Sequence, residues 1–478
     1  MSTVLTHKRA YINGAWVDGG GELIEVRSPH SRQVIGTVPK CGPAEVEAAV
    51  QAAKQAFPAW KRTPLLERVD LLYRAYAICK ERNEQIARQI SEEMGKTIRE
   101  SREEMEIYAC DHFRRAAEDA LRFRGQFLPS TQEHTSNKRI VVAHEPVGVV
   151  GVITPWNFPV DIAAISICYA LAAGDTVVWK PSEHAPLSSA MLAEVIDEAG
   201  FPPGTVNMVT GEGDAGQAVA GHPDVSSLVF TGSTKTGLAI AQEVGLKPRV
   251  LELGGNGPII VRADADLDRA ADAAIMGCFY MAGQCCTAAE RLLVHESVKA
   301  EFTSRLVART EALRVGDPLA EETDMGPLCN EGVLAKTRAH LEDAVGKGAT
   351  VVVGGTAEGL YFAPTVIDGV TPEMEIAREE TFGPVAPIIA FSSDEEAISI
   401  ANGTDYGLTA AVFTNDLRAA WQFAESLQHG TVMVNETTNY WDQLAPFGGT
   451  KKSGVGRELS SWMLDVLTEP KQIVFDIG

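Results

Sequence analysis

The spacing of apolar and polar residues changes along the first third of the chain. Two segments before residue 41, YINGAWVDGG and ELIEVRSPHSRQVIGTVPK, alternate and predict short strands joined by Asn-Gly and Gly-rich turns. From Ala44 to about Glu118 the apolar residues recur at helical spacing, and Gly95 ends the longest helical stretch. Residues 125–145 are polar with strand-like alternation near their end, which predicts an extended ribbon rather than part of a core.

A strand–helix alternation begins at Val147. The run VGVVGVIT is almost continuously apolar, as a strand buried on both faces must be, and a helical segment follows it. The segments DTVVWK, TVNMVT and SSLVFTG repeat this pattern, which predicts a doubly wound parallel sheet with helices on both faces. Such sheets bind ligands at the carboxyl ends of their strands. A second alternation after the turn GGNGP predicts a second α/β domain.

Composition and charge narrow the class of protein. The chain has 478 residues, enough for two or three domains, and 42 Lys and Arg against 64 Asp and Glu give a net charge of −22. So acidic a protein is not expected to bind nucleic acid or an anionic membrane surface, since both favour a basic face. Its longest apolar run, 162–174, is too short to span a bilayer. The eight cysteines include no C-x-x-C pair, and the N-terminus has no apolar signal segment. We therefore expect a cytoplasmic protein with reduced thiols and no metal site.

Two glycine-containing turns are candidates for phosphate binding. Residues 211–216 match G-x-G-x-x-G between a strand and a helix, but the acidic residue expected further on is missing, so an unliganded turn is equally compatible. The next strand–helix turn, 230–237, offers hydroxyls and N–H groups at a helix N-terminus, which suits either an anion or a capping box. Lys180 and Glu183 at a strand end either hold a ribose or form a solvated surface pair.

Four residues have the character of catalytic groups. Cys285 and Cys286 follow small residues, and a following helix N-terminus would lower the pKa of a thiol there; the alternative is a pair of inert buried thiols. Glu252, between leucines at a strand end, is either a buried paired charge or a general base. Asn157 follows a strand and either donates its amide to an oxyanion or forms an Asx-turn.

Seven motifs, taken together, resemble the NAD(P)-dependent aldehyde dehydrogenase superfamily across essentially the whole chain. Several are weakly specific alone, but their order and spacing are highly specific together. Gly257 departs mildly, because the family usually has a small side chain there. The motifs are PWNFP (155–159), WKPSE (179–183), FTGSTKTG (230–237), LELGGNGP (251–258), F-x-x-x-GQCC (279–286), EETFGPV (379–385) and PFGGTKKSGVGRE (446–458).

The resemblance implies catalytic roles. The family nucleophile stands two residues after the Gln of GQ-x-C, which is Cys286 rather than Cys285. Asn157 and the Cys286 backbone N–H match the oxyanion donors, and Glu252 matches the general base. The implied reaction oxidises an aldehyde through a cysteine thiohemiacetal and a thioester, which a Glu-activated water hydrolyses. Relatives that pass the acyl group to coenzyme A lack this glutamate, so a non-acylating enzyme is expected.

A cofactor site is implied as well. Glu183 is expected to accept the ribose hydroxyls and to repel a 2′-phosphate, which favours NAD while leaving NADP possible. The residues that match cofactor contacts are Ile153, Thr154, Pro155, Trp156, Lys180, Glu183, Gly213, Ser233, Leu253, Glu380 and Phe382.

The predicted fold class is α/β with three parts. These are a doubly wound parallel-sheet NAD-binding domain (1–124 and 146–252), a second α/β catalytic domain (253–462) and a β-ribbon oligomerisation extension (125–145 with the C-terminal strand segment 463–478). Family members assemble through the last two segments, so the resemblance implies a homodimer or homotetramer. The expected partner is a small-molecule aldehyde, with neither nucleic acid nor membrane.

The substrate is less constrained. Relatives acting on succinic semialdehyde tend to carry an Arg after the PWNFP-type motif and another before GQ-x-C, where this chain has no basic residue. A neutral aliphatic or aromatic aldehyde is therefore the first expectation. A carboxylate-bearing semialdehyde is the alternative if Arg114, Arg115, Arg457 or another residue supplies the charge.

Two further readings stay open. A cofactor-free thiol esterase would need a histidine beside Cys286, and none lies near it in the sequence. A non-catalytic binding protein is disfavoured because the catalytic set is intact. An apolar substrate tunnel would be lined by some of the aromatic residues Phe158, Phe279, Tyr280, Tyr440 and Trp441.

Overall fold

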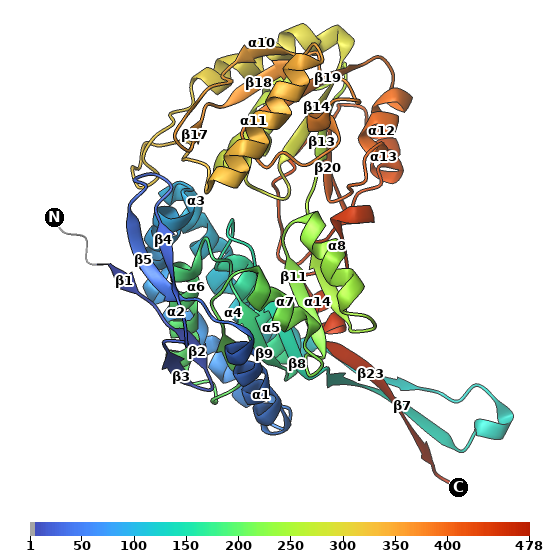
Figure 1. Cartoon of the computed structure of the whole chain (residues 1–478). Helices are drawn as coiled ribbons and strands as arrows, with labels where there is room; N and C mark the ends of the chain where they lie inside the picture. The colour runs from blue at the N-terminus through green and yellow to red at the C-terminus, as the bar shows by residue number, and fades with distance from the viewer. Residues whose placement is uncertain (1–4) are drawn as a thin grey trace.

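The computed structural model describes residues 5–478 and arranges them in two α/β lobes and a projecting arm (Figure 1). The lower lobe in Figure 1 is built on an eight-stranded sheet, the upper lobe on a seven-stranded sheet, and the arm on a three-stranded antiparallel sheet. The predicted fold class is confirmed. Within residues 5–478, no helix combines the length and apolar character needed to cross a membrane.

The eight-stranded sheet contains the predicted doubly wound core. Its order is β22-β12-β11-β8-β9-β10-β2-β3, with five central parallel strands and antiparallel additions at both edges. The chain runs from β8 outward to β10 and then crosses back to β11, so the loops after β8 and β11 meet at a switch point, where such sheets bind ligands. The strands are β2 (Ala10–Ile12), β3 (Ala15–Val17), β8 (Val149–Ile153), β9 (Thr176–Lys180), β10 (Val206–Met208), β11 (Ser227–Thr231), β12 (Arg249–Glu252) and β22 (Gly454–Val455).

Helices cover both faces of this sheet. One face carries α1, α7 and α8, and the other carries α5 and α6, which are backed by α2 and α4. Every residue of β8 and β9 is buried, which agrees with their continuously apolar sequences. The helices are α1 (Pro43–Trp60), α2 (Leu65–Met94), α3 (Ile98–Glu103), α4 (Cys110–Arg122), α5 (Asp161–Ala173), α6 (Pro186–Ala199), α7 (Gly213–Gly221), α8 (Thr234–Glu243) and α14 (Ser460–Val466).

The long helical region contains one feature that its spacing does not predict. Helix α2 ends at Gly95 as expected, and the φ of Gly95, 96°, is a left-handed value that favours glycine. Between α3 and α4, however, the helix widens into a π-turn, η1 (Glu104–Ala109). A π-turn interrupts the regular backbone hydrogen bonds of the α-helix, and such turns are common near functional sites. This one turns Glu104 into the core and brings Tyr108 to a pocket described below.

The seven-stranded sheet confirms the second α/β alternation. Its order is β15-β18-β19-β14-β13-β20-β21, and all neighbours are parallel except β15 and β18. The strands are β13 (Gly257–Val261), β14 (Ala289–His295), β15 (Thr350–Val353), β18 (Thr365–Asp368), β19 (Val385–Phe391), β20 (Thr409–Phe413) and β21 (Thr431–Val434). The helices are α9 (Leu267–Phe279), α10 (Glu296–Glu311), α11 (Glu331–Gly346), α12 (Asp394–Asn402) and α13 (Leu417–Ser426).

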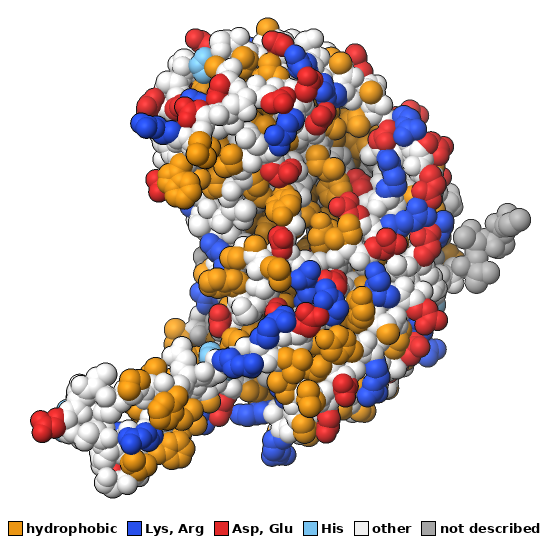
Figure 2. All heavy atoms as spheres, turned by 180° about the vertical axis from the view of Figure 1, so that it is seen from behind, with side chains coloured by type: hydrophobic (Ala, Val, Ile, Leu, Met, Phe, Trp, Pro, Cys, Tyr) orange, Lys and Arg blue, Asp and Glu red, His pale blue; other side chains and the backbone are white. Residues whose placement is uncertain are grey.

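The arm confirms the predicted extended ribbon. Strand β7 (Lys138–Pro146) pairs with β6 (Gln126–Leu128) and, over its whole length, with the C-terminal strand β23 (Thr468–Asp476). Phe127 and Phe475 are 65% and 53% exposed on it, and apolar side chains gather along the arm in the space-filling view (Figure 2).

Five short strands form two further small sheets outside the arm. They are β1 (Thr6–His7), β4 (Leu23–Arg27), β5 (Val34–Pro39), β16 (Ala357–Glu358) and β17 (Tyr361–Phe362).

The division of the chain into domains stays a prediction. One observation bears on its last boundary: β22 lies within 253–462 by sequence, yet it pairs with β12 of the other lobe's sheet. The C-terminal part of that range therefore contributes to both lobes.

Candidate active site

Two pockets adjoin Cys286. The first, here called the interlobe pocket, has a volume of about 330 Å³ and is lined by loops that follow β8, β11 and β12 and by residues of the other lobe. The second, here called the aromatic pocket, is narrower, with a volume of about 50 Å³. Among the described residues, Ile162 and Cys286 alone line both pockets, and of these two Cys286 carries a nucleophile. The aromatic pocket is lined by Tyr108, His112, Phe158, Asp161, Ile162, Ile165, Cys286, Trp441, Gln443, Phe447, Glu458 and Leu459.

The loop that carries Cys286 begins in a strained conformation. Met281 and Ala282 have φ values of 52° and 56°, a left-handed region that costs free energy for residues other than glycine. Gln284 offsets part of this cost, because its side chain donates to the Met281 carbonyl (2.9 Å) and accepts from the Cys329 N–H (2.8 Å). The loop is thereby tied to the segment that precedes α11.

The Gly-Gly turn after β12 approaches this loop closely. A Cβ on Gly255 would stand 2.4 Å from the carbonyl oxygen of Cys286, a separation that backbone atoms cannot accommodate. Glycine is thus required at this position for the turn after Glu252 and the cysteine loop to lie in contact.

The two adjacent cysteines differ in environment, as expected. Cys285 is 1% exposed and packs among Phe158, Ile162 and other apolar residues, whereas Cys286 is half-buried and faces the pockets. A hydrogen bond to the Cys285 sulfur, together with burial, raises the pKa of the Cys286 thiol well above its ordinary value. The expected helix N-terminus after Cys286 is wrong, because strand β14 follows it. The thiol therefore needs a base rather than a helix dipole for ionisation.

Asn157 bonds across the structure rather than within its own turn. Its amide Nδ2 donates to the Gln284 carbonyl at 3.1 Å, so the Asx-turn alternative is wrong. The second amide hydrogen remains available, and no hydrogen bond from the Cys286 backbone N–H to any residue in 5–478 is formed. These are two donors close to Cys286.

Glu252 is a buried carboxylate at the end of β12. It is 3% exposed, and no hydrogen bond of normal geometry reaches either oxygen. Burial and then the nearby Glu458 raise the pKa of Glu252 well above its ordinary value, while Arg457 acts weakly in the other direction. Of the two readings from sequence, the geometry matches an unpaired carboxyl rather than a salt-bridged one.

A buried lysine joins several of these elements. Lys96 and Glu104 form an ion pair in which both side chains are fully buried. Lys96 Nζ also donates to the Asn157 carbonyl at 2.8 Å and lies 4.3 Å from the centre of the Phe158 ring. Glu104 in turn accepts from the N–H groups of Val160 and Asp161 at 3.0 Å each. No motif in the sequence points to this pair.

Six of the residues predicted to bind cofactor line the interlobe pocket. They are Pro155, Trp156, Ser233, Leu253, Glu380 and Phe382.

Contacts around these six residues organise the pocket wall. The Trp156 and Phe382 rings meet edge to face at 5.6 Å, and Glu380 accepts from the Gly255 N–H at 3.0 Å. Ser233 caps α8 by accepting from Thr236 N–H, so the helix N-terminus faces the pocket wall. His184 and Lys336 also line the pocket and were not found from the sequence.

The other five predicted residues lie outside this lining. Ile153 and Thr154 are buried at the end of β8, and Gly213 starts α7, where a Cβ would meet nothing within 4 Å. Lys180 and Glu183 form an ion pair at 3.0 Å. The Lys180 side chain is only 6% exposed, so the solvated-pair alternative is wrong. Although burial opposes it, Lys180 holds the pKa of Glu183 below its ordinary value.

The aromatic pocket contains two of the five aromatic residues predicted for a tunnel. Phe158 and Trp441 line it, with ring centres 5.6 Å apart. Phe279 and Tyr280 instead line a separate cavity, and Tyr440 is 51% exposed. The pocket's polar residues His112, Asp161 and Gln443 lie outside every motif and were missed.

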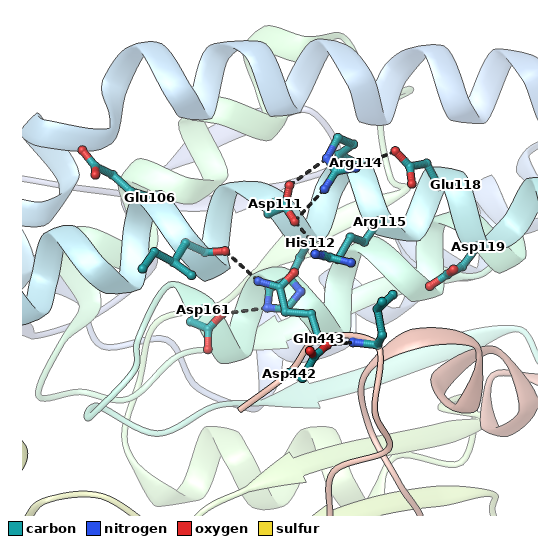
Figure 3. Close-up of polar contacts among 12 residues, drawn as sticks. Glu106, Asp111, His112, Arg114, Arg115, Glu118, Asp119, Asp161, Asp442 and Gln443 are labelled. Carbon is teal, nitrogen blue, oxygen red and sulfur yellow. Dashed lines mark hydrogen bonds and ion pairs between the residues drawn. The ribbon is translucent and has the colours of Figure 1, made fainter. Parts of the chain in front are cut away.

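The three candidate arginines are engaged elsewhere. Arg114 binds Asp111 and Glu118, and Arg115 also binds Asp111 (Figure 3). Arg457 donates to two backbone carbonyls of its own loop. None of them lines either pocket.

Comparison with known proteins identifies close relatives. The model described as "Aldehyde dehydrogenase family" matches residues 16–473. The chain is 39% identical to the glutarate-semialdehyde dehydrogenase of Pseudomonas putida, covering 99% of this chain and 98% of the relative. It is also 39% identical to a succinate-semialdehyde dehydrogenase of Escherichia coli (strain K12) whose name specifies NADP(+), covering 98% and 97%.

Solved structures agree with these relatives. The betaine aldehyde dehydrogenase of Staphylococcus aureus, solved in complex with NAD+, superposes with a TM-score of 0.95 at 35% identity. The match covers 98% of this chain and 95% of that one.

Replacing Lys96 tests the structural importance of the buried pair. Lys96→Met leaves the Glu104 carboxylate buried without its partner, which is expected to lower the free energy of unfolding by about 3–5 kcal/mol. Urea unfolding at fixed protein concentration measures the change. Lys452→Met, which breaks an exposed pair with Asp405, is the matched control and should change the free energy of unfolding much less than Lys96→Met, because solvent screens the exposed pair. Equal stability of the two variants would contradict the prediction.

Proposed function

The chain belongs to the aldehyde dehydrogenase family, and we propose that it oxidises an aldehyde to the carboxylic acid with NAD(P)+, without transfer to coenzyme A. The observation that carries this proposal is the position of Cys286. It is the one nucleophile that lines both the interlobe and the aromatic pocket, so cofactor and aldehyde can reach it from opposite sides.

The proposed first step is attack by Cys286 on the aldehyde carbon. The thiol proton passes to the ionised form of Glu252, because the raised pKa of this carboxyl makes it a stronger base than an ordinary carboxylate. The carbonyl oxygen becomes the oxyanion of a thiohemiacetal. The Asn157 amide and the Cys286 N–H are the available donors for this charge.

The second half of the reaction converts the thiohemiacetal into the acid. NAD(P)+, when bound, accepts the hydride that leaves the thiohemiacetal carbon, and a thioester on Cys286 results. Glu252 releases the thiol proton to solvent and then takes a proton from water, whose oxygen attacks the thioester carbon. The Cys286 sulfur leaves as a thiolate when the carboxylic acid departs, and Glu252 returns its proton to that thiolate. The unpaired, buried carboxyl of Glu252 suits this role, since no salt bridge competes for it.

The interlobe pocket fits a dinucleotide. It lies at the switch point of the sheet and is lined by Ser233 at the N-terminus of α8, a favourable place for a pyrophosphate. Trp156, Leu253 and Phe382 supply apolar walls, with Ile153, Thr154 and Pro155 forming the adjoining strand end. Lys180, Glu183 and Gly213 are proposed for the adenosine half. The pKa of Glu183, held below its ordinary value by Lys180, keeps a carboxylate that favours NAD over NADP, and a relative has been solved in complex with NAD+.

A carboxylate-bearing semialdehyde is the second candidate substrate. The names of relatives that act on glutarate and succinate semialdehydes favour it. Against it, Arg114, Arg115 and Arg457 all have other partners, and within residues 5–478 no arginine or lysine lines the aromatic pocket.

A cofactor-free thiol esterase is less well supported. His112 does line the aromatic pocket with Cys286, but its Nε2 is hydrogen-bonded to Asp161 at 2.7 Å, so this nitrogen is not free to act on the thiol.

Assembly as a homodimer or homotetramer through the arm is also proposed. Its support is the exposed apolar residues Phe127, Val474 and Phe475.

The nucleophile can be identified by substitution. Cys286→Ala should lower NADH formation on the order of 10³-fold or more across a panel of aliphatic and aromatic aldehydes, because no thioester can form. Cys285→Ala is the matched control, and it should retain most activity because its thiol faces the apolar cluster. Activity that survives in Cys286→Ala would exclude this assignment, and ester hydrolysis without NADH formation in the wild type would favour the esterase.

The role of Glu252 predicts a pH dependence. A carboxyl with a raised pKa is neutral at low pH and gains its basic form as pH rises, so kcat should increase with pH, over a range above that of an ordinary carboxyl group. Glu252→Gln should lower kcat roughly 10²–10⁴-fold and flatten this rise, with an acyl adduct on Cys286 detectable by mass spectrometry. An unchanged pH profile in the variant would show that another group is the base.

Cofactor preference tests Glu183. The ionised carboxylate should repel a 2′-phosphate, so kcat/KM for NAD should exceed that for NADP by roughly tenfold or more. Glu183→Gln should narrow the ratio, whereas Glu198→Gln, at the far end of α6, should leave it unchanged. A larger kcat/KM for NADP in the wild type would refute this reading.

A further inference from the structure

The aromatic pocket contains polar groups that the reaction proposed above does not use. Asp161 is the first residue of α5, and its side chain is 21% exposed. His112, 2% exposed, donates its Nε2–H to Asp161 Oδ1 at 2.7 Å (Figure 3). A carboxylate at this position also stabilises the helix N-terminus. That effect alone does not require a buried histidine to orient the carboxylate.

Gln443 adds a buried acceptor without a partner. The side chain is 6% exposed, and its Nε2 donates to the Ile107 carbonyl of the π-turn at 2.7 Å. This bond fixes the amide, and Oε1 is left buried with no hydrogen bond in the described part of the chain. An unsatisfied buried acceptor costs about 1–3 kcal/mol, so its retention needs an explanation. A ligand with a donor group would supply one.

Glu458 contributes a third acceptor. It is 7% exposed, and its Oε2 also has no hydrogen bond from residues 5–478. Burial, followed by the charge of Asp161, raises the pKa of Glu458 to about 8. The site therefore already disfavours a second negative charge beside Asp161, and a carboxylate from a substrate would meet the same unfavourable field.

Positive charge near the pocket is already neutralised. Lys96 lies against the Phe158 ring, but it is paired with Glu104. The Arg114 and Arg115 guanidinium groups bind Asp111. The two fully buried side-chain atoms of the lining without a hydrogen bond from residues 5–478, Gln443 Oε1 and Glu458 Oε2, are thus both oxygens that can accept from a donor.

The aromatic walls favour the same kind of ligand. The Trp441 ring meets Tyr108 edge to face at 5.9 Å and Phe158 at 5.6 Å. Faces of such rings attract cations, with a larger effect where water is excluded. Acceptors on one side and rings on the other are complementary to an ammonium group that still carries N–H donors.

We propose that Asp161 and Gln443 make the aromatic pocket selective for short aliphatic aldehydes with a primary ammonium group at the far end. The ammonium donates to Asp161 and to Gln443 Oε1 and lies against the rings of Trp441 and Tyr108. His112 is a positioning residue that orients Asp161. The inference rests on the proposed function, since it names the substrate class of that same site.

Matched aldehydes test this directly. The panel is 3-aminopropanal, 3-hydroxypropanal, butanal, succinic semialdehyde and 3-(trimethylammonio)propanal, assayed with NAD and with NADP. We expect kcat/KM for 3-aminopropanal to exceed that for butanal and 3-hydroxypropanal roughly tenfold and that for succinic semialdehyde roughly 100-fold. The trimethylammonium compound has the charge without N–H donors, so it should fall below 3-aminopropanal.

Substitutions in the aromatic pocket distinguish its role in substrate selectivity from general effects on the activity of the enzyme. Asp161→Asn should lower the ratio of kcat/KM for 3-aminopropanal over butanal roughly tenfold, mainly through KM, and Gln443→Leu should lower it severalfold. Asp394→Asn, the same substitution at the first residue of α12, is the control and should not change the ratio. Circular dichroism establishes that each variant is folded, and Gln443→Leu replaces Asp161→Asn as the test if the latter does not fold.

The outcomes distinguish this inference from the proposed function. If no aldehyde in the panel produces NADH or NADPH, the proposed function itself fails. If butanal is oxidised but 3-aminopropanal has no advantage, or if succinic semialdehyde is preferred, the inference on Asp161 is overturned. An unchanged ratio in both pocket variants overturns it as well. Equal rates for the primary and trimethylated ammonium compounds would exclude a donor role toward Gln443.

Discussion

The buried ion pair between Lys96 and Glu104 is the interaction on which both pockets depend. Two unpaired charges at this depth would be very unfavourable, so the elements that carry them must meet. Lys96 follows the end of α2 and binds the carbonyl of Asn157, while Glu104 starts the π-turn and binds two N–H groups at the start of α5. One pair therefore orients the oxyanion donor, the Phe158 wall and the Asp161 side chain together.

The electrostatics of the site contrast with those of the whole molecule. A net charge of −22 opposes the approach of an anionic dinucleotide, so binding must rely on local groups. The N-terminus of α8 and Lys180 are such groups at the sheet edge. Around Cys286, burial acts on Glu252 and Glu458 and raises their pKa values, which keeps carboxyl groups close together without a full charge on each.

Much of the fold and of the reacting centre could be predicted because local patterns carry them. The apolar run before Asn157 requires a strand buried on both faces, and the glycine after Glu252 permits a backbone approach that no other residue allows. The helix N-terminus expected after Cys286 failed, since a strand follows there. The π-turn was also missed, because its wider spacing is a small departure from helical periodicity within a continuous helical pattern.

The sequence by itself determined the α/β class, the family and the candidate catalytic residues Cys286, Glu252 and Asn157, because these lie in motifs whose local order is preserved on folding. Only the tertiary structure decided the surroundings of the two thiols and the residues that line the aromatic pocket. His112, Asp161 and Gln443 come from two helices and a distant loop, and they share a pocket only through long-range packing. The physical reason is that burial, pairing and missing partners depend on contacts between segments far apart along the chain, which periodicity and spacing do not record.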